Sequence, residues 1–206
     1  MSSRVYDCLA HIGARITENR DFLTDLDREI GDADHGANMA RGFAAVVEKV
    51  PRDSPDIGAA LKKTGMTLLS TVGGASGPLY GTAYMEAAKV LTGSETLSAQ
   101  GFVDALTAAV AGIQKRGKSV RGEKTMLDAL IPALEAYTAR IAAGGSLADG
   151  LDDACAAAEA GVAYTKTIAA TKGRASYLGE RSIGHQDPGA TSAAITLGAI
   201  RDFMKG

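Results

Sequence analysis

Apolar residues recur every three to four positions along nearly the whole chain, which is the spacing of one face of an α-helix. The alternation of apolar and polar residues that marks a half-buried strand hardly appears. The apolar stripes fall in eight stretches, at about residues 5–30, 39–50, 57–72, 79–90, 98–113, 127–141, 151–172 and 195–203. The pattern therefore predicts an all-α protein of eight helices, in a single domain that spans residues 1–206.

The connections between these helices differ in chemistry according to their place in the chain. Because short connections make consecutive helices antiparallel neighbours, the first, third, fifth and seventh connections are expected at one end of the bundle. These four contain an aspartate-rich loop, a glycine-rich loop, a basic loop and a long polar loop, at about residues 31–38, 73–78, 115–124 and 173–189. The other three are shorter and chemically plain. We therefore predict that the functional site lies at the end where the four polar loops meet.

The aspartate-rich loop brings together three carboxylates, those of Asp27, Asp32 and Asp34. Residues two apart point to nearly opposite sides of a helix, so Asp32 and Asp34 can share a ligand only in an extended loop, here one with glycine corners. Converging carboxylates repel one another unless a cation lies between them. Because ligands that are all oxygen suit Mg²⁺ or Ca²⁺, we interpret the loop as a metal site. The alternative is helix capping and turn formation, for which Asp and Gly are also common.

Three other segments offer contacts to an anionic ligand. Gly73–Pro78 should open a helix with unpaired backbone N–H groups and the Ser76 hydroxyl, which suits an anion, although a flexible turn is the alternative. In the long polar loop, Arg174 is a candidate phosphate clamp, and Asp187-Pro188-Gly189 forms a rigid turn before the last helix. Met126 belongs either to the core or to the wall of an adenine pocket.

Two familiar motifs fit poorly in their context, although a P-loop NTPase, which would contain strands, stays open as an alternative. Residues 112–119 match the P-loop pattern G-x-x-x-x-G-K-S, but that motif needs a strand before it, and Gly112 lies inside a helical stripe. The aspartate-rich loop is not an EF-hand, because Phe43 stands where an EF-hand needs its bidentate glutamate.

Composition limits the class of protein. Hydrophobic residues make up 46% and charged residues 22% of the chain, as in ordinary soluble domains. A net charge of −2 argues against a general nucleic-acid binder. Cys8 and Cys155 lie within apolar helical stripes, which is typical of buried thiols in a reducing compartment. Neither a signal peptide nor a membrane-spanning stretch is evident, so we expect a cytoplasmic protein.

Four ordered motifs resemble those of the nucleotide-binding subunit of dihydroxyacetone kinase: residues 26–39, Gly74–Pro78, Lys124–Asp128 and Asp187–Ala190. The resemblance covers essentially the whole chain and implies an eight-helix, up-and-down antiparallel barrel with the nucleotide at one end. It implies that Asp27, Asp32 and Asp34 hold two Mg²⁺ ions that bridge the phosphates of ADP or ATP. It further implies phosphate contacts from His35, Gly36, Ala37, Asn38, Ala75, Ser76 and Arg174. The rest of the nucleotide would be enclosed by Gly117, Met126, Asp187, Pro188 and Gly189.

The resemblance also bears on the reaction. In ATP-dependent members of the family, a dihydroxyacetone-binding domain precedes this one. Here nothing precedes the first helix, so we expect the free-standing type that depends on phosphoenolpyruvate. In that type, a phosphocarrier subunit recharges bound ADP, and the phosphoryl group passes to dihydroxyacetone on a separate subunit. Because the chain offers no convincing general base, we expect the substrate-activating groups on that partner.

Two other functions would preserve the same four loops. The chain could be an ATP-dependent kinase subunit for another small ketose or sugar acid. Alternatively, it could be a nucleotide-binding regulatory module that docks on a transcription factor and transfers no phosphoryl group.

Overall fold

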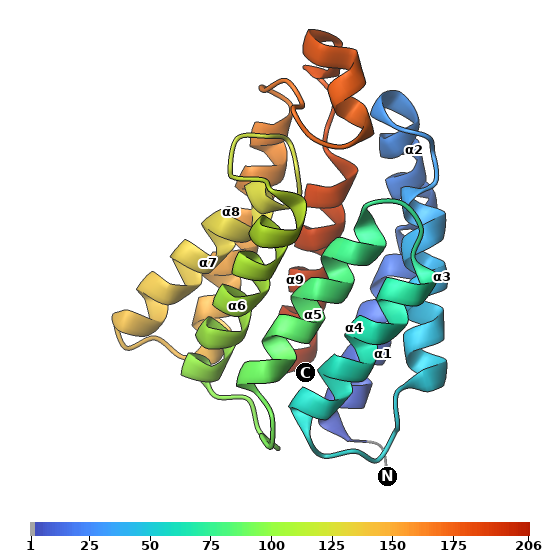
Figure 1. Ribbon diagram of the computed structural model, residues 1–206. Coiled ribbons are helices and arrows are strands. Elements are labelled where there is room, and N and C mark those ends of the chain that lie inside the picture. The colour runs from blue at the N-terminus through green and yellow to red at the C-terminus, as the bar shows by residue number, and fades with distance from the viewer. Residues whose placement is uncertain (1–2) are drawn as a thin grey trace.

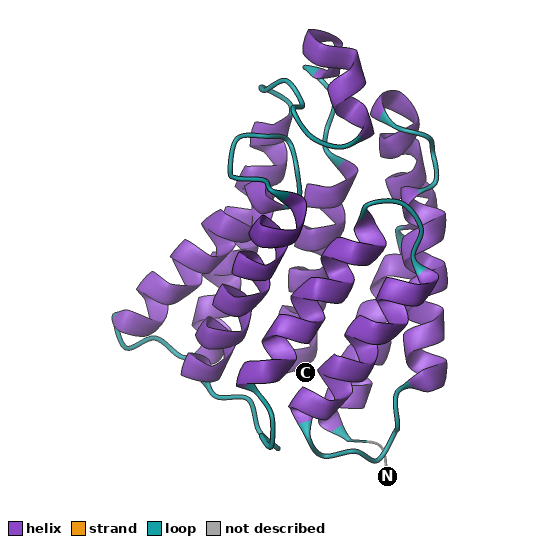
Figure 2. Ribbon diagram, in the orientation of Figure 1, coloured by secondary structure: helices purple, strands orange, loops and turns teal. Residues whose placement is uncertain are grey.

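The regular structure of the chain is helical throughout the part described by the computed structural model, residues 3–206, and this part contains no strand (Figure 2). The α-helices are α1 (Arg4–Glu18), α2 (Arg20–Ile30), α3 (His35–Lys49), α4 (Ile57–Thr71), α5 (Ser76–Val90), α6 (Ala99–Gly117), α7 (Leu127–Ala142), α8 (Leu147–Thr165) and α9 (Pro188–Lys205). A 3₁₀ helix, η1 (Arg174–Ser182), lies between α8 and α9. The predicted all-α fold is confirmed; Met1 and Ser2 of the predicted domain lie outside the described residues.

The first predicted helix, at about residues 5–30, is in fact two helices that meet at Asn19. The Asn19 side-chain amide donates to the Arg15 carbonyl oxygen at 2.8 Å, and the Asn19 backbone N–H donates to the same oxygen. Such side-chain bonds to nearby backbone compete with the helical ladder, which is why Asn is unfavourable inside helices. Since α1 and α2 both pack on α3, they still form one wall of the molecule, and the described chain has eight walls.

These walls form a closed ring of antiparallel helices (Figure 1). Each wall packs on the next along the chain, and α9 packs back on α1 and α2. The ring encloses an apolar cavity of about 380 Å³, whose lining includes Leu9, Ile12, Tyr84 and Leu106. The arrangement is therefore the up-and-down antiparallel barrel that the resemblance implied. The four polar loops lie at one end, at the top of Figure 1, and the described ends of the chain lie towards the other.

Small residues let neighbouring walls approach closely. Gly161 of α8 faces the backbone of α7, where a Cβ atom at residue 161 would lie 2.0 Å from the carbonyl oxygen of Asp128. No real Cβ tolerates that distance, so the contact between α7 and α8 depends on glycine. The absence of a side chain here brings the start of α7, which belongs to the polar end, directly against α8.

One predicted helix end differs from the structure. The seventh predicted helix was expected to run to about Lys172, whereas α8 ends at Thr165. Its start agrees with the sequence, because Ser146 and Asp149 form the reciprocal bonds of a capping box. Its end does not, because the Thr165 carbonyl oxygen accepts from the ammonium of Lys124, a residue distant in the sequence. The alanine-rich pattern continues past Thr165, but a tertiary contact stops the helix.

No helix within residues 3–206 is both long and apolar enough to cross a bilayer.

The close contact between α7 and α8 gives a first test. We expect Gly161→Ala to lower the free energy of unfolding by roughly 2–3 kcal/mol, as overpacking of a filled contact does. Gly198→Ala, inside α9, is the matched control, because nothing lies within 4 Å of the position that its new methyl group would occupy. That variant should gain about 1 kcal/mol from helix propensity. Urea unfolding measures both, and a Gly161→Ala protein as stable as wild type would contradict the contact.

Candidate functional site

The four polar loops line one cavity of about 430 Å³ at the top end of the barrel. We call it the mouth cavity. The structure brings most of the predicted site residues to its wall: Asp27, Asp32, Asp34, His35, Ala75, Ser76, Gly117, Met126, Arg174, Asp187, Pro188 and Gly189. Gly36, Ala37 and Asn38 do not line it. The inference that the odd-numbered connections share one end is therefore confirmed.

The three aspartates of the first loop converge. Asp27, Asp32 and Asp34 can each offer a carboxylate oxygen such that all three oxygens lie within 4.8 Å of one another. The expected glycine corners are only partly responsible, because Gly36 lies inside α3 and the sharp turn falls at Ala33, whose φ is +60°. A left-handed residue between Asp32 and Asp34 breaks the alternation of an extended chain and lets the two side chains face the same cavity. An all-oxygen set of this spacing fits a hard divalent cation such as Mg²⁺.

Asp27 fixes the shape of this loop. It is 8% exposed at the end of α2, and its Oδ2 accepts hydrogen bonds from the backbone N–H groups of Asp34 at 2.9 Å and His35 at 3.1 Å. Those groups belong to the unpaired start of α3, which a carboxylate satisfies well. Gly31 leaves room for this carboxylate, since a Cβ at that position would lie 2.0 Å from Asp27 Oδ1. Asp27 is therefore both a candidate metal ligand and the anchor of the loop.

Arg174 approaches the carboxylates from the long polar loop. At the start of η1, its Nε donates to Asp32 Oδ2 at 2.8 Å. The guanidinium thus supplies one positive charge beside three carboxylates, which reduces their mutual repulsion. Arg174, the predicted phosphate clamp, therefore lies next to the predicted metal site. Its contact with phosphate remains a prediction.

The His35 ring is already engaged by protein groups. Its Nδ1 lies 3.0 Å from Ser76 Oγ, and its Nε2 lies 2.9 Å from Ser192 Oγ, which in turn lies 2.7 Å from the Tyr80 hydroxyl. Burial lowers the pKa of His35 below its ordinary value and thus favours the neutral ring, against the opposing effect of Asp27 and Asp34. A neutral imidazole has one donor and one acceptor, and the two serines occupy both. The ring therefore orients Ser76 at the start of α5.

Ser192 and Tyr80 were not found by sequence reasoning. They lie inside helical stripes of α9 and α5, where a polar residue resembles any other buried hydroxyl, and only the packing of the two helices joins them to His35.

Gly36 and Asn38 do not line the mouth cavity, but they pack against the segments that do. Gly36 permits contact between α3 and α2, because a Cβ there would lie 2.0 Å from the carbonyl oxygen of Arg20. Asn38 is buried beside Gly73 of the glycine-rich loop, and its Oδ1 accepts from Arg41 at 2.6 Å. Their predicted phosphate contacts, like that of Ala37, remain predictions.

The far side of the mouth cavity contains a buried cluster of charges from Lys124, Asp128 and Asp187. Asp128 accepts from the backbone N–H groups of Gly122 at 2.5 Å and Thr125 at 2.8 Å, which folds the end of the basic loop. Asp187 caps α9, accepting from Ala190 N–H at 2.6 Å. Burial raises the pKa of Asp187 to about 7, although the Ala190 bond and Lys124 oppose the rise.

From the sequence, Met126 could belong either to the core or to the wall of a binding pocket. It is 4% exposed, packs in the main core and also lines the mouth cavity, so it is both a core residue and a wall of the site. The P-loop match is also resolved: Gly112 and Gly117 lie within α6, and no strand precedes them in residues 3–206. The prediction that this match is not a true P-loop is therefore confirmed.

The pKa of Asp187 gives a second test. A carboxyl whose pKa rises on folding from 3.8 to about 7 holds its proton more tightly in the folded state, so wild-type stability should fall as pH rises through that range. Asp187→Asn keeps the capping oxygen and removes the titrating group. We expect its Tm, measured without metal or nucleotide, to increase relative to wild type between about pH 5 and about pH 8. An equal Tm difference at both pH values would contradict the assignment.

Comparison with known proteins identifies the family of the chain. Residues 29–202 match the DAK2 domain. The chain is 48% identical over 93% of its length to the ADP-binding subunit DhaL of PEP-dependent dihydroxyacetone kinase 1 from Listeria innocua, covering 91% of that protein. It is 47% identical over 95% of its length to the corresponding Escherichia coli subunit, covering 93%.

A solved structure shows the same fold. The dihydroxyacetone kinase of C. freundii in complex with AMP-PNP and Mg²⁺ superposes with a TM-score of 0.74 at 25% identity, over 96% of this chain and 33% of that one. The resemblance inferred from the four motifs is thus confirmed. The chain belongs to the DAK2 domain family.

Proposed function

We propose that this chain is the ADP-binding subunit of a phosphoenolpyruvate-dependent dihydroxyacetone kinase, acting as one domain over residues 1–206. It holds ADP or ATP with two Mg²⁺ ions and passes the phosphoryl group to dihydroxyacetone bound on a partner subunit. A phosphocarrier subunit recharges the ADP. The observation on which this proposal rests is the convergence of three carboxylate oxygens within 4.8 Å, on the wall of the same cavity as the glycine-rich loop and Arg174.

These groups would form the part of the site that binds Mg²⁺ and the phosphates, which we call the phosphate half. Asp27, Asp32 and Asp34 would hold the Mg²⁺ ions, which supply positive charge next to the phosphate oxygens. No side chain caps the start of α5, so its first N–H groups are available to an anion, and His35 holds the Ser76 hydroxyl beside them. Phosphoryl transfer depends mainly on such positioning and charge neutralisation rather than on covalent chemistry by the protein.

The nucleoside half would lie on the opposite wall. Gly117 ends α6, Met126 precedes α7, and Asp187–Gly189 open α9, and all of them line the mouth cavity. Met126 and Gly189 lie close together, since a Cβ at residue 189 would be 3.8 Å from Met126 Cβ. An apolar cavity wall of this kind suits a purine base.

The partner subunits are proposed from the relatives. The two relatives that are 47–48% identical are named as subunits of PEP-dependent enzymes, and this chain covers 91–93% of their length. By contrast, the human triokinase/FMN cyclase is 34% identical, and the chain covers only 36% of it. The greater identity to the short relatives favours the phosphocarrier route over direct use of exchanging ATP.

Removal of one metal ligand tests the nucleotide site. We expect Asp32→Ala to weaken the binding of ADP in the presence of Mg²⁺ by more than the roughly 100-fold that loss of an outer-shell partner costs, with unchanged helical circular dichroism. Asp53→Ala is the control, because this exposed aspartate lies in the connection between α3 and α4, at the other end of the barrel. Isothermal titration calorimetry measures both. Equal affinities in the two variants would overturn the metal assignment.

Reconstitution tests the reaction. With MgATP and dihydroxyacetone, the chain alone should form no dihydroxyacetone phosphate, because the substrate-activating groups are expected on the partner. Adding the dihydroxyacetone-binding and phosphocarrier subunits of the E. coli enzyme, with phosphoenolpyruvate and the phosphotransfer proteins that feed the carrier, should start turnover. Turnover by the chain alone would contradict the split site. Nucleotide binding without turnover on dihydroxyacetone would favour a different substrate or a regulatory role.

A further inference from the structure

Lys124 is a buried lysine whose position suggests a purpose beyond stability. Its side chain is 2% exposed, and its backbone has φ of +60°, an unfavourable conformation for a residue with a side chain. It lines the mouth cavity between the basic loop and α7. Burial of an ammonium is costly unless its hydrogens are all bonded. Because its burial and its backbone conformation are both unfavourable, Lys124 must be held there by specific contacts.

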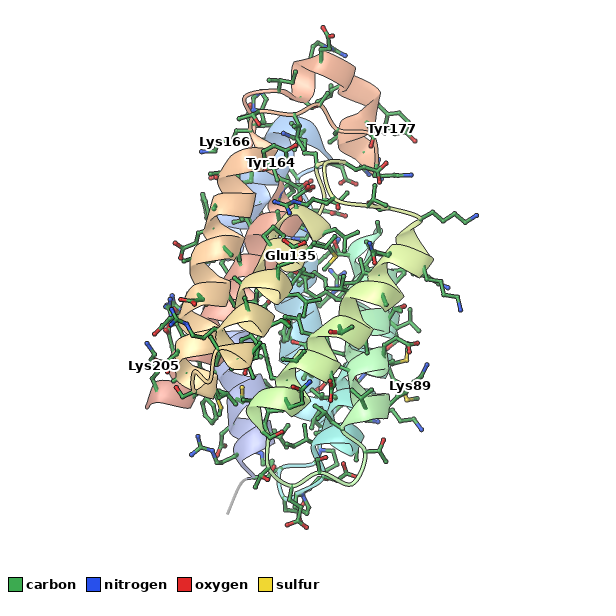
Figure 3. The ribbon with its side chains drawn as sticks, turned by 90° about the vertical axis from the view of Figure 1, so that its left-hand side faces the viewer. Lys89, Glu135, Tyr164, Lys166, Tyr177 and Lys205 are labelled. Carbon is green, nitrogen blue, oxygen red and sulfur yellow. The ribbon has the colours of Figure 1, made fainter. Side chains whose placement is uncertain are left out.

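Those contacts join the two ends of a single loop, residues 166–186, which we call the Arg174 loop. Lys124 Nζ donates to the carbonyl oxygens of Thr165 and Ile168, where the loop begins, and of His185, where it ends. The Ile168 bond is the longest, at 3.4 Å. Three ammonium hydrogens thus meet three acceptors, the full capacity of the group. Figure 3 shows Tyr164 and Lys166 where α8 passes into this loop, and Tyr177 on η1 at its outer part.

Two carboxylates partly offset the cost of burying Lys124. Burial lowers the pKa of the lysine, and nearby Asp187 and Asp128 oppose that change. The neighbouring residue, Glu123, also contacts the loop, since its backbone oxygen and its side chain accept from Thr171. The basic loop and the Arg174 loop are therefore fastened together beside the mouth cavity.

Other bonds at the same base are weaker and uncharged. Gly184 N–H donates to the Lys166 carbonyl oxygen at 2.7 Å, and Asp187 N–H donates to Thr165 Oγ1 at 3.0 Å. Bonds to a charged donor contribute more than neutral ones. Between the two fastened ends, the loop extends across the mouth cavity and presents Arg174 to Asp32.

From this geometry we propose that Lys124 is a positioning residue for nucleotide binding, which acts by closing the base of the Arg174 loop so that Arg174 reaches the phosphate half of the site. The proposal rests on the proposed function, because it assumes that the mouth cavity binds ADP with Mg²⁺. It assigns Lys124 no contact with the nucleotide. Its effect should therefore depend on the presence of Arg174.

A double-mutant cycle tests this dependence. We expect Lys124→Met to raise the Kd for ADP with Mg²⁺ by roughly 10-fold or more, the scale of losing hydrogen bonds to a charged group. In an Arg174→Ala background, the same substitution should change the Kd less than about 2-fold, because the loop then has no guanidinium to position. Isothermal titration calorimetry gives the four affinities. Equal factors in both backgrounds would overturn the proposal, because Lys124 would then act independently of Arg174.

A matched control separates this effect from general loss of a lysine. Lys118→Met removes another lysine of the basic loop that also has positive φ, at +47°, but is exposed. Its Kd should stay at the wild-type value. Amide hydrogen exchange of Lys124→Met should increase in residues 166–186 and stay unchanged in α4. If Lys124→Met binds like Lys118→Met while wild type binds ADP, this inference fails and the proposed function stands. If wild type binds no ADP, the proposed function itself fails.

A second variant covers the case in which Lys124→Met does not fold. Thr165→Val is close in shape and removes only the hydroxyl that accepts from Asp187 N–H at the same loop base. We expect it to weaken ADP binding in the presence of Arg174 and to have little effect in the Arg174→Ala background. Unchanged binding in both backgrounds would count against the proposal.

Discussion

The mutual repulsion of three carboxylates at one end of the barrel is the constraint on which the rest of the site depends. Asp27, Asp32 and Asp34 lie close enough to share a cation, and such an arrangement is unfavourable without positive charge nearby. The chain meets this demand with N–H groups at the start of α3, which bond Asp27, and with Arg174, which bonds Asp32. A metal–phosphate complex would meet it further. We therefore expect the cluster to cost stability in the free protein and to favour binding of a cation.

The antiparallel barrel makes this arrangement possible. Because connections alternate between the two ends, α3, α5, α7 and α9 all begin at the mouth cavity. Each helix start offers N–H groups that a ligand or a carboxylate can accept. In α3 and α9 these groups are bonded by Asp27 and Asp187, whereas α5 has no side-chain cap. The fold thus leaves the start of α5 available for an anion and uses acidic residues to fix the starts of α3 and α9.

The residues of the site come from two kinds of structure, the helix ends of the barrel and the Arg174 loop. The aspartates, His35 and Ser76 lie at or next to helix ends, and packing such as the Gly36–Arg20 contact determines where those ends lie. Arg174 comes instead from a long loop, at the start of η1, and the bonds at the base of that loop help to set its position. Loops that are held by a rigid scaffold are a common source of binding residues. Lys124 connects the two parts, because it is the last residue of the basic loop and bonds both ends of the Arg174 loop.

The sequence alone determined the helical fold, the alternation of polar and plain connections, and the residue types of the site. Periodicity is a local property, and short connections force neighbouring helices to be antiparallel, so the shared end of Asp27, Ser76, Met126 and Asp187 could be inferred before any contact was known. Only the tertiary structure decided that Asn19 breaks the first helix, that α8 ends at Thr165, and that His35 bonds Ser76 and Ser192. Each of these outcomes depends on a side chain that competes for a particular hydrogen-bonding group. Except at Asn19, the partners are far apart in the sequence, and no local pattern records which of them will meet.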